Sequence, residues 1–158
     1  MSLTAQMAKH LRDVHFGGNW TAVNLRDTLA DVNWEEATRK VESFNTIAVL
    51  VYHIGYFVSA VLPVFRGEPL TAKDKYSFSH QPIASEQDWQ TMLNKSWEEA
   101  ELLAQCIEQL PEERLSDDFW EAKYGSWFRN IQGIIEHTHY HLGQIVIIKK
   151  LIQAEAKK

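Results

Sequence analysis

The chain of 158 residues has few cysteines, no surplus of positive charge and no signal for a β-hairpin. Its one cysteine, Cys106, excludes an internal disulfide and suits a reducing cytosol. Its apolar neighbours favour an inert core thiol over a nucleophile. A formal net charge of -5 argues against binding to a phosphate backbone, which requires clustered Lys and Arg. We therefore expect a cytoplasmic protein that does not bind nucleic acid.

The sequence also lacks the marks of export. Residues 1–15 contain no basic stretch followed by an apolar block, so no signal peptide is expected. Residues 46–65 carry no Asp, Glu, Lys or Arg and are long enough to cross a bilayer. Because the amphipathic helices around this segment need an apolar partner, we interpret it as the central helix of a soluble bundle. A membrane span is the alternative.

Helical periodicity dominates the sequence. Apolar residues recur at helical spacing in four long segments, at about 2–16, 45–65, 85–110 and 126–153. Helix is expected to resume near Asn19, after a break at Gly17 and Gly18. Asn33 and Glu36 have the spacing of a capping box, which predicts a short helical turn that follows Asn33.

Four long helices predict an all-α protein built as a four-helix bundle, with residues 1–158 forming a single domain. The polar connection at 66–84 is a long crossover between the second and third helices. It is long enough to reverse the usual up-down order of a bundle. Bundles of this kind commonly hold metal ions in the core, with ligands from facing helices.

Two histidines of the fourth segment stand where a helix normally places isoleucine. His137 and His141 are four residues apart, so their Cβ atoms should lie about 5–6 Å from each other on one face. The stripe to which they belong contains Ile131, Ile134, His137, His141, Ile145 and Ile148. Something inside the protein must satisfy the imidazole nitrogens, and a metal ion is the simplest candidate.

His53 is a third histidine in apolar surroundings, within the second long segment. A single buried histidine is more often a hydrogen-bonded core residue than a ligand. Three unpaired ones would cost roughly 3–9 kcal/mol, which is comparable with a domain's whole stability of about 5–15 kcal/mol. Coordination of one divalent ion would remove that cost, provided that the three rings converge on one point.

The other histidines are weaker candidates. His139 lies two residues from each partner, so we expect it across the helix, facing solvent or a subunit contact. His80 in the crossover is interpreted as a surface side chain that could approach a pocket. His10, close to the apolar stripe of the first helix, is the reserve ligand, and His15 follows it on the same helix.

Two pieces of the chain resemble the DinB-like superfamily of metalloenzymes. One is Val51-Tyr52-His53-Ile54 in the second long helix. The other is His137-x-x-x-His141-Leu142-Gly143-Gln144-Ile145 in the fourth. The spacing of the two histidines is common by chance, but the Gly-Gln-Ile tail and the upstream helical histidine make the match fairly specific.

The resemblance implies a four-helix bundle in up-down-down-up order and a homodimer. It further implies a divalent metal, commonly zinc or nickel, held by His53, His137 and His141 with open positions for water. Relatives with an assigned activity include thiol-S-transferases that use bacillithiol or related low-molecular-weight thiols, and a mycothiol-dependent maleylpyruvate isomerase. Most members have no known substrate. No motif beyond the triad assigns a thiol or a substrate here.

Three neutral histidines with an open position are typical of a catalytic rather than a structural zinc site. Coordination would lower the pKa of a bound water or thiol, which fits a hydrolase and a thiol transferase equally. Gln144, one turn after His141, either orients a ligand or packs as a helix amide. Tyr56, Trp20 and Asn19 are further candidates for the pocket, with core packing as the default for Tyr56.

Three hypotheses follow from these observations. The first is a metal-dependent enzyme, a thiol-S-transferase or hydrolase acting on a small molecule, with possible use of a low-molecular-weight thiol as cosubstrate. The second is a non-enzymatic, stress-associated binding or interaction module whose metal is structural or vestigial. The third is a hydrogen-bonded polar core without a metal, which would need three separate partners in apolar surroundings.

Overall fold

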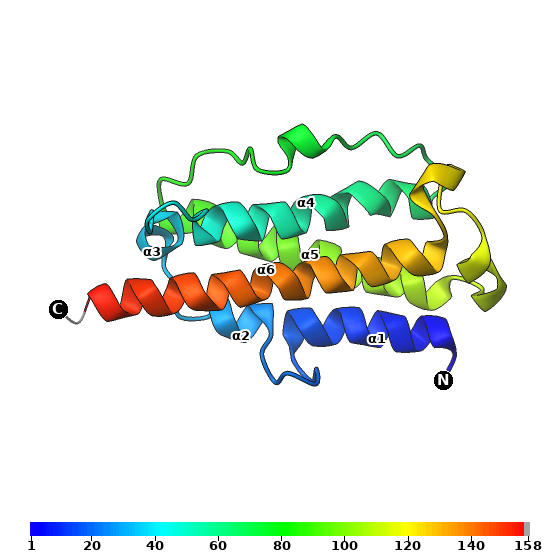
Figure 1. Ribbon diagram of the computed structural model, residues 1–158, viewed down its shortest axis with the longest axis horizontal. Coiled ribbons are helices and arrows are strands. Elements are labelled where there is room, and N and C mark those ends of the chain that lie inside the picture. The colour runs from blue at the N-terminus through cyan, green and yellow to red at the C-terminus, as the bar shows by residue number, and fades with distance from the viewer. Residues whose placement is uncertain (157–158) are drawn as a thin grey trace.

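The computed structural model describes residues 1–156, and this part of the chain contains helices and loops but no β-strand (Figure 1). The all-α prediction is therefore confirmed for these residues. Lys157 and Lys158, the last two residues of the predicted domain, lie outside the described residues. Four long helices lie side by side in Figure 1: α1 (Leu3–Phe16), α4 (Ile47–Phe65), α5 (Glu86–Gln109) and α6 (Trp127–Glu155).

Short helices complete the chain between the long ones. Two α-helical turns, α2 (Leu25–Leu29) and α3 (Trp34–Thr38), connect α1 with α4. Three 3₁₀ turns follow: η1 (Asp74–Tyr76), η2 (Glu112–Ser116) and η3 (Ala122–Tyr124). Among the long helices, α1 and α4 each pack against both α5 and α6, so α6 borders α4 on one side and α1 on the other.

Side-chain caps begin these helices at the places that the sequence indicates. Each capping oxygen accepts a hydrogen bond from a backbone N–H of the first turn, which contributes about 1 kcal/mol per helix. The cap of α3 is a full capping box between Asn33 and Glu36, as predicted. The four long helices α1, α4, α5 and α6 are capped in the same way by the side chains of Ser2, Thr46, Ser85 and Ser126, respectively.

The prediction that a helix resumes near Asn19 is wrong. Residues 17–24 form a loop, and α2 begins only at Leu25, where the Asn24 side chain accepts a hydrogen bond from Asp27 N. Positive φ angles at Gly17, Gly18 and Ala22 hold this loop out of helical geometry. The Asn19 amide also donates to the Val23 carbonyl within the loop, an alternative to helical bonding that asparagine readily offers.

Helix α4 is long and apolar enough to cross a membrane by length and composition, with a mean hydropathy of 2.0. It packs against both α5 and α6, and 56% of its most apolar window is buried inside the protein. Its interior positions include Leu50, Ile54 and Val58, which join the core clusters of the bundle. This is the pattern of a core helix in a soluble protein, as interpreted from the sequence.

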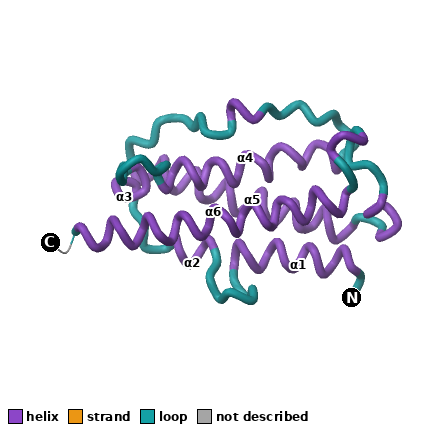
Figure 2. The backbone as a smooth tube through the Cα atoms, viewed as in Figure 1, coloured by secondary structure: helices purple, strands orange, loops and turns teal. Residues whose placement is uncertain are grey.

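The segment 66–84, which we call the crossover, leaves α4 at Gly67 (φ +80°) and returns to the start of α5. Figure 2 shows it as a long loop that runs along the outside of α4, interrupted by η1. The Tyr56 hydroxyl fastens it to α4, since it donates to the Lys73 carbonyl and accepts from the Lys73 N–H. Ser77 is 1% exposed, whereas residues 71–76 and Phe78 are exposed, so the middle of the crossover is buried at Ser77 and otherwise faces solvent.

Candidate metal centre

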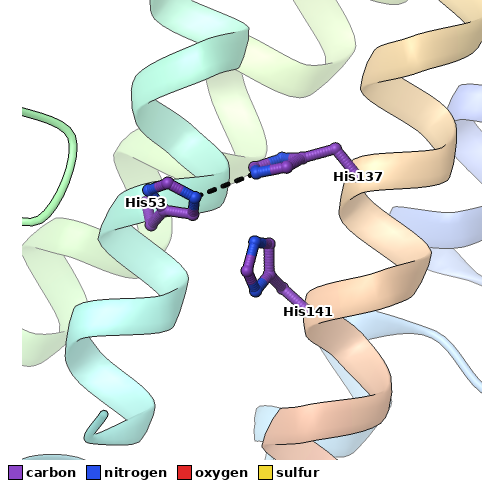
Figure 3. A group of neighbouring side chains, drawn as sticks. All are labelled: His53, His137 and His141. Carbon is purple, nitrogen blue, oxygen red and sulfur yellow. Dashed lines mark hydrogen bonds between the residues drawn. The ribbon is translucent and has the colours of Figure 1, made fainter. Parts of the chain in front are cut away.

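The structure brings His53, His137 and His141 together between α4 and α6. One ring nitrogen from each lies within 4.8 Å of those from the other two. Figure 3 shows His53 projecting from α4 toward the two α6 side chains, with a hydrogen bond between the rings of His53 and His137. The helical spacing of His137 and His141 places both on the face of α6 that looks toward α4.

Hydrogen bonds fix which nitrogen carries the hydrogen in two of the rings. His53 Nδ1 donates to the Ser77 carbonyl at 3.2 Å, and His141 Nδ1 donates to Gln144 Oε1 at 2.7 Å. A carbonyl or amide oxygen can only accept, so both Nδ1 atoms carry hydrogen and both Nε2 atoms present a lone pair. Such outer partners are the groups that orient histidine ligands in metal sites.

His137 has no such partner. Its Nε2 lies 3.0 Å from His53 Nε2, where it must donate because the His53 nitrogen has no hydrogen to give. Its Nδ1 is buried and has no hydrogen-bond partner in the described residues. A buried polar atom left unpaired costs about 1–3 kcal/mol, so the cluster of rings is incomplete as a hydrogen-bond network.

The surroundings favour the neutral form of the His53 and His137 imidazoles. The pKa of His137 is lowered to about 4, chiefly by burial and to a smaller extent by the neighbouring His141 and His53. Burial also lowers the pKa of His53, against an opposing contribution from its bond to the Ser77 carbonyl. Neutral imidazole is the form that binds metal ions, so the pocket favours the ligand state of both rings at neutral pH.

The donor set fits a divalent ion. Imidazole nitrogens suit zinc, nickel, copper and iron, and three of them leave a coordination position for another ligand. Zinc–nitrogen bonds of about 2.0–2.1 Å allow two ligand nitrogens to be at most about 4.2 Å apart. The three nitrogens, which lie within 4.8 Å of one another, would have to move closer together to share one ion.

Aromatic side chains enclose the histidines. The Phe78 ring stacks on His53 with centroids 3.9 Å apart and planes 13° apart. Phe57 lies edge-on to both His53 and His137, at 5.1 and 4.8 Å. Sequence reasoning missed Ser77, Phe57 and Phe78 as parts of the site. Phe57 is one turn from His53 and could have been found by that spacing, whereas no local signal marks the two crossover residues.

A cavity of about 620 Å³ opens beside His137, between α4, α6 and the crossover. Tyr56, for which core packing was the default expectation and a place in the pocket the alternative, lines this cavity, and its hydroxyl is engaged with Lys73. Gln144 bonds His141 directly, so of its two predicted roles the structure favours the orienting one.

Two of the predicted pocket residues lie elsewhere. Trp20 is 99% exposed on the loop after α1, and it does not line the cavity beside His137. Asn19 is buried in the same loop, but its amide serves Thr21 and the Val23 carbonyl. The prediction placed both at the start of a helix near the pocket mouth, and the loop geometry at 17–24 removes that placement.

The remaining histidines form a second group, which we call the α1–α6 group: His10, His15 and His139. His139 is half-buried against α1, with its ring 6.1 Å from the ring of His10, so it faces a helix of its own chain rather than solvent. His15 is 1% exposed and its Nδ1 donates to the Leu11 carbonyl. Burial lowers the pKa of His15 to about 4. His10 is exposed and is not part of the group formed by the three histidines of the triad, so nothing supports its predicted role as a reserve metal ligand.

Two further residues considered in the sequence analysis, His80 and Cys106, lie outside the metal centre. His80 lines a separate cavity of about 540 Å³ between α4, α5 and the crossover, where its Nδ1 bonds the Gln81 carbonyl. Cys106 is partly buried on α5, and burial raises the pKa of its thiol, which is consistent with an unreactive side chain.

A family model described as "DinB superfamily" matches residues 18–145, which include all three histidines of the candidate metal centre. No curated protein and no solved structure matches the chain.

Proposed function

The chain belongs to the DinB superfamily, and on that premise we propose that it binds a divalent metal, zinc or nickel, through His53, His137 and His141. The observation that carries the proposal is the convergence of three imidazoles, with one ring nitrogen of each within 4.8 Å of those from the other two. We propose further that the site is catalytic and acts on a small molecule, as a thiol-S-transferase or a hydrolase. A low-molecular-weight thiol is the proposed cosubstrate of the transferase.

The chemistry of the proposal is simple. A divalent ion held by three neutral ligands acts as a Lewis acid and lowers the pKa of a water or thiol bound to it. The protein's own residues would orient the ligands, through the Ser77 carbonyl and Gln144, and exclude bulk water through Phe57 and Phe78. The cavity beside His137 supplies the space for a substrate.

Metal analysis of untagged protein tests the assignment. We expect about one divalent ion per chain by mass spectrometry, and its loss in His137→Ala and in the triple variant of His53, His137 and His141. His139→Ala, on the same helix but turned toward α1, is the matched control and should keep its metal. Full metal content in the triple variant would show that the ion binds elsewhere.

A second measurement separates an enzyme from a binding module. Cobalt-substituted protein should change its visible spectrum on addition of azide or a thiol if a coordination position is open. A screen of thiols with electrophiles, and of ester and amide substrates, should then show turnover that chelation abolishes. Strong loss of thermal stability on chelation, with no turnover and no spectral response, would instead indicate a structural ion in a non-enzymatic module.

We also propose a homodimer in the cytoplasm, with the four long helices in up-down-down-up order. The return of the crossover along the outside of α4 supports that order. Exposed apolar side chains on one face of α6, at Tyr140, Ile147 and Leu151, support a subunit contact. Light scattering should give twice the chain mass, and Ile147→Glu should reduce it to one chain. A monomeric wild type would contradict the dimer.

A further inference from the structure

The cavity beside His137 is lined by both apolar and charged residues. Phe57 and Val61 from α4, with Ile134 from α6, are among the apolar ones, and the Phe57 ring also contacts the ring of His137. Glu136 and Asp74 line it near the histidines, and the charge of Asp74 acts on the His53 imidazole. A ligand in this cavity would therefore bury an apolar body and meet carboxylates at the histidine end.

Arg129 lines the same cavity from the first turn of α6, eight residues before His137. With a rise of 1.5 Å per residue, the two positions lie about 12 Å apart along the helix axis. The cavity thus has negative groups beside the triad and a positive group at the far end. In the metal-free protein, an anionic group on a bound molecule would be repelled from the first and attracted to the second. A divalent ion at the triad would offset the two carboxylates, which leaves Arg129 as the cationic group of the chain itself.

The guanidinium of Arg129 is held in place but not neutralised. Its Nη1 donates to the Tyr124 carbonyl at 3.0 Å. Gly125, at φ +75°, makes room for the side chain, because a Cβ there would lie 2.8 Å from Arg129 Cδ. In residues 1–156 no carboxylate pairs with Arg129. Four other arginines do have acidic partners, namely Arg12, Arg39, Arg66 and Arg114.

We propose that this cavity binds an elongated organic carboxylate, with the carboxylate on Arg129, the apolar body on Phe57, Val61 and Ile134, and the other end at His137. The proposal rests on the proposed function in one respect, since it makes the end beside His137 the reacting end. A planar guanidinium with free donors matches a carboxylate through two parallel hydrogen bonds. Asn130, which lines the cavity next to Arg129, already bonds the Tyr124 and Ser126 carbonyls and so supports the wall rather than the ligand.

Calorimetry with two matched compounds tests the proposal: 5-phenylpentanoate and 5-phenylpentan-1-ol, which share the apolar body and differ in charge. The full-length protein is titrated both as purified and after chelation of metal. We expect the carboxylate to bind about tenfold more tightly than the alcohol, the effect of one charged hydrogen-bonded pair at a partly exposed site. Arg129→Gln should remove this preference and leave the affinity for the alcohol unchanged. Arg66→Gln, which replaces an exposed arginine outside the cavity, should keep it.

Gly125→Ala offers a second way to break the site without changing its charge. The added Cβ would displace the Arg129 side chain, so the preference for the carboxylate should fall while Arg129 is still present. Circular dichroism of each variant establishes that it is folded. Equal binding of acid and alcohol to the wild type, a preference that survives in Arg129→Gln, or no binding of either compound at millimolar concentration would overturn the proposal.

The outcomes for the metal and for the carboxylate are separable. If the triple histidine variant keeps its metal while Arg129 still governs carboxylate binding, only the proposed function fails. If the metal binds at the triad and Arg129 has no effect on carboxylate binding, only the assignment of the ligand fails.

Discussion

Helix α6 carries histidines on two faces, and the two groups that they form are unlike. Toward α4, His137 and His141 meet His53 with ring nitrogens aimed at one another. Toward α1, in the α1–α6 group, His15 bonds the carbonyl of its own helix, and the rings of His10 and His139 lie 6.1 Å apart. Burial alone therefore does not make a metal site. The triad differs because its ring nitrogens converge on one another. In addition, the Nδ1 atoms of His53 and His141 are hydrogen-bonded to the Ser77 carbonyl and to Gln144, which leaves the Nε2 lone pair of each ring pointing inward.

The largest expected effect is the stabilisation of the protein by a metal ion, which should depend on the triad and not on the α1–α6 group. An ion that binds only the folded protein stabilises it by about 4 kcal/mol at a thousand times its dissociation constant. For a chain of this size we expect zinc or nickel to raise Tm by about 8–16 °C, measured by calorimetry with and without chelator. His137→Ala should lose this increment, whereas His10→Ala should keep it. A metal-dependent increment of equal size in His137→Ala would erase the distinction between the groups.

The next effect is the pH dependence of stability that comes from His15 in the α1–α6 group. The pKa of His15 is lowered to about 4 by burial, from an ordinary value of 6.5. The unfolded chain therefore binds a proton at this residue before the folded chain does. Its contribution to stability is complete above pH 6.5 and is lost as pH falls toward 4, by about 3 kcal/mol.

Metal-free protein provides the cleanest measurement of that effect. Denaturant unfolding of the wild type and of His15→Leu at several pH values between 7 and 4 should show a smaller loss of stability in the variant. His137 shares the low pKa, so the variant will keep part of the slope. Parallel curves for the two proteins would show that His15 titrates alike in the folded and unfolded states.

The smallest effect sharpens the comparison at a single hydrogen bond. Gln144 accepts from His141 Nδ1, and loss of such an outer partner typically costs 10–100-fold in metal affinity, or about 1.4–2.7 kcal/mol. Competition with a chromogenic chelator should show this loss in Gln144→Leu. Gln144→Glu, which keeps an accepting oxygen, should retain most of the affinity. If both variants bind metal like the wild type, Gln144 packs without orienting the ring.

Much of the helical framework could be predicted because its signals are local. Ser85 and Ser126 cap helices at the predicted places, and the i, i+4 spacing of His137 and His141 is enough to put them on one face. The pairing with His53 was accessible too, since three buried imidazoles have few ways to be satisfied. These inferences need only the chain's own periodicity.

The failures fall where tertiary contacts decide. Ser77 and Phe78 reach His53 from a crossover more than 20 residues away, and nothing in their local sequence indicates it. His139 was expected to face solvent or a subunit contact, because its angle on α6 can be predicted from the sequence but the position of α1 cannot. Trp20 was a candidate for the pocket mouth because it follows the break at Gly17 and Gly18, whereas it is 99% exposed on the loop after α1.

Because α6 is one continuous helix, it limits where insertions and deletions can occur in this chain during evolution. One helix carries Arg129, His139 and two of the three histidines of the triad, and each inserted residue would rotate everything beyond it by about 100°. A single insertion between residues 129 and 137 would thus turn the cavity wall away from the imidazoles, whatever residue was added. Insertions at the exposed ends of the crossover carry no such penalty, because a loop absorbs extra length at little entropic cost. Related chains should accordingly vary in length between α4 and α5 and stay gapless along the first half of α6.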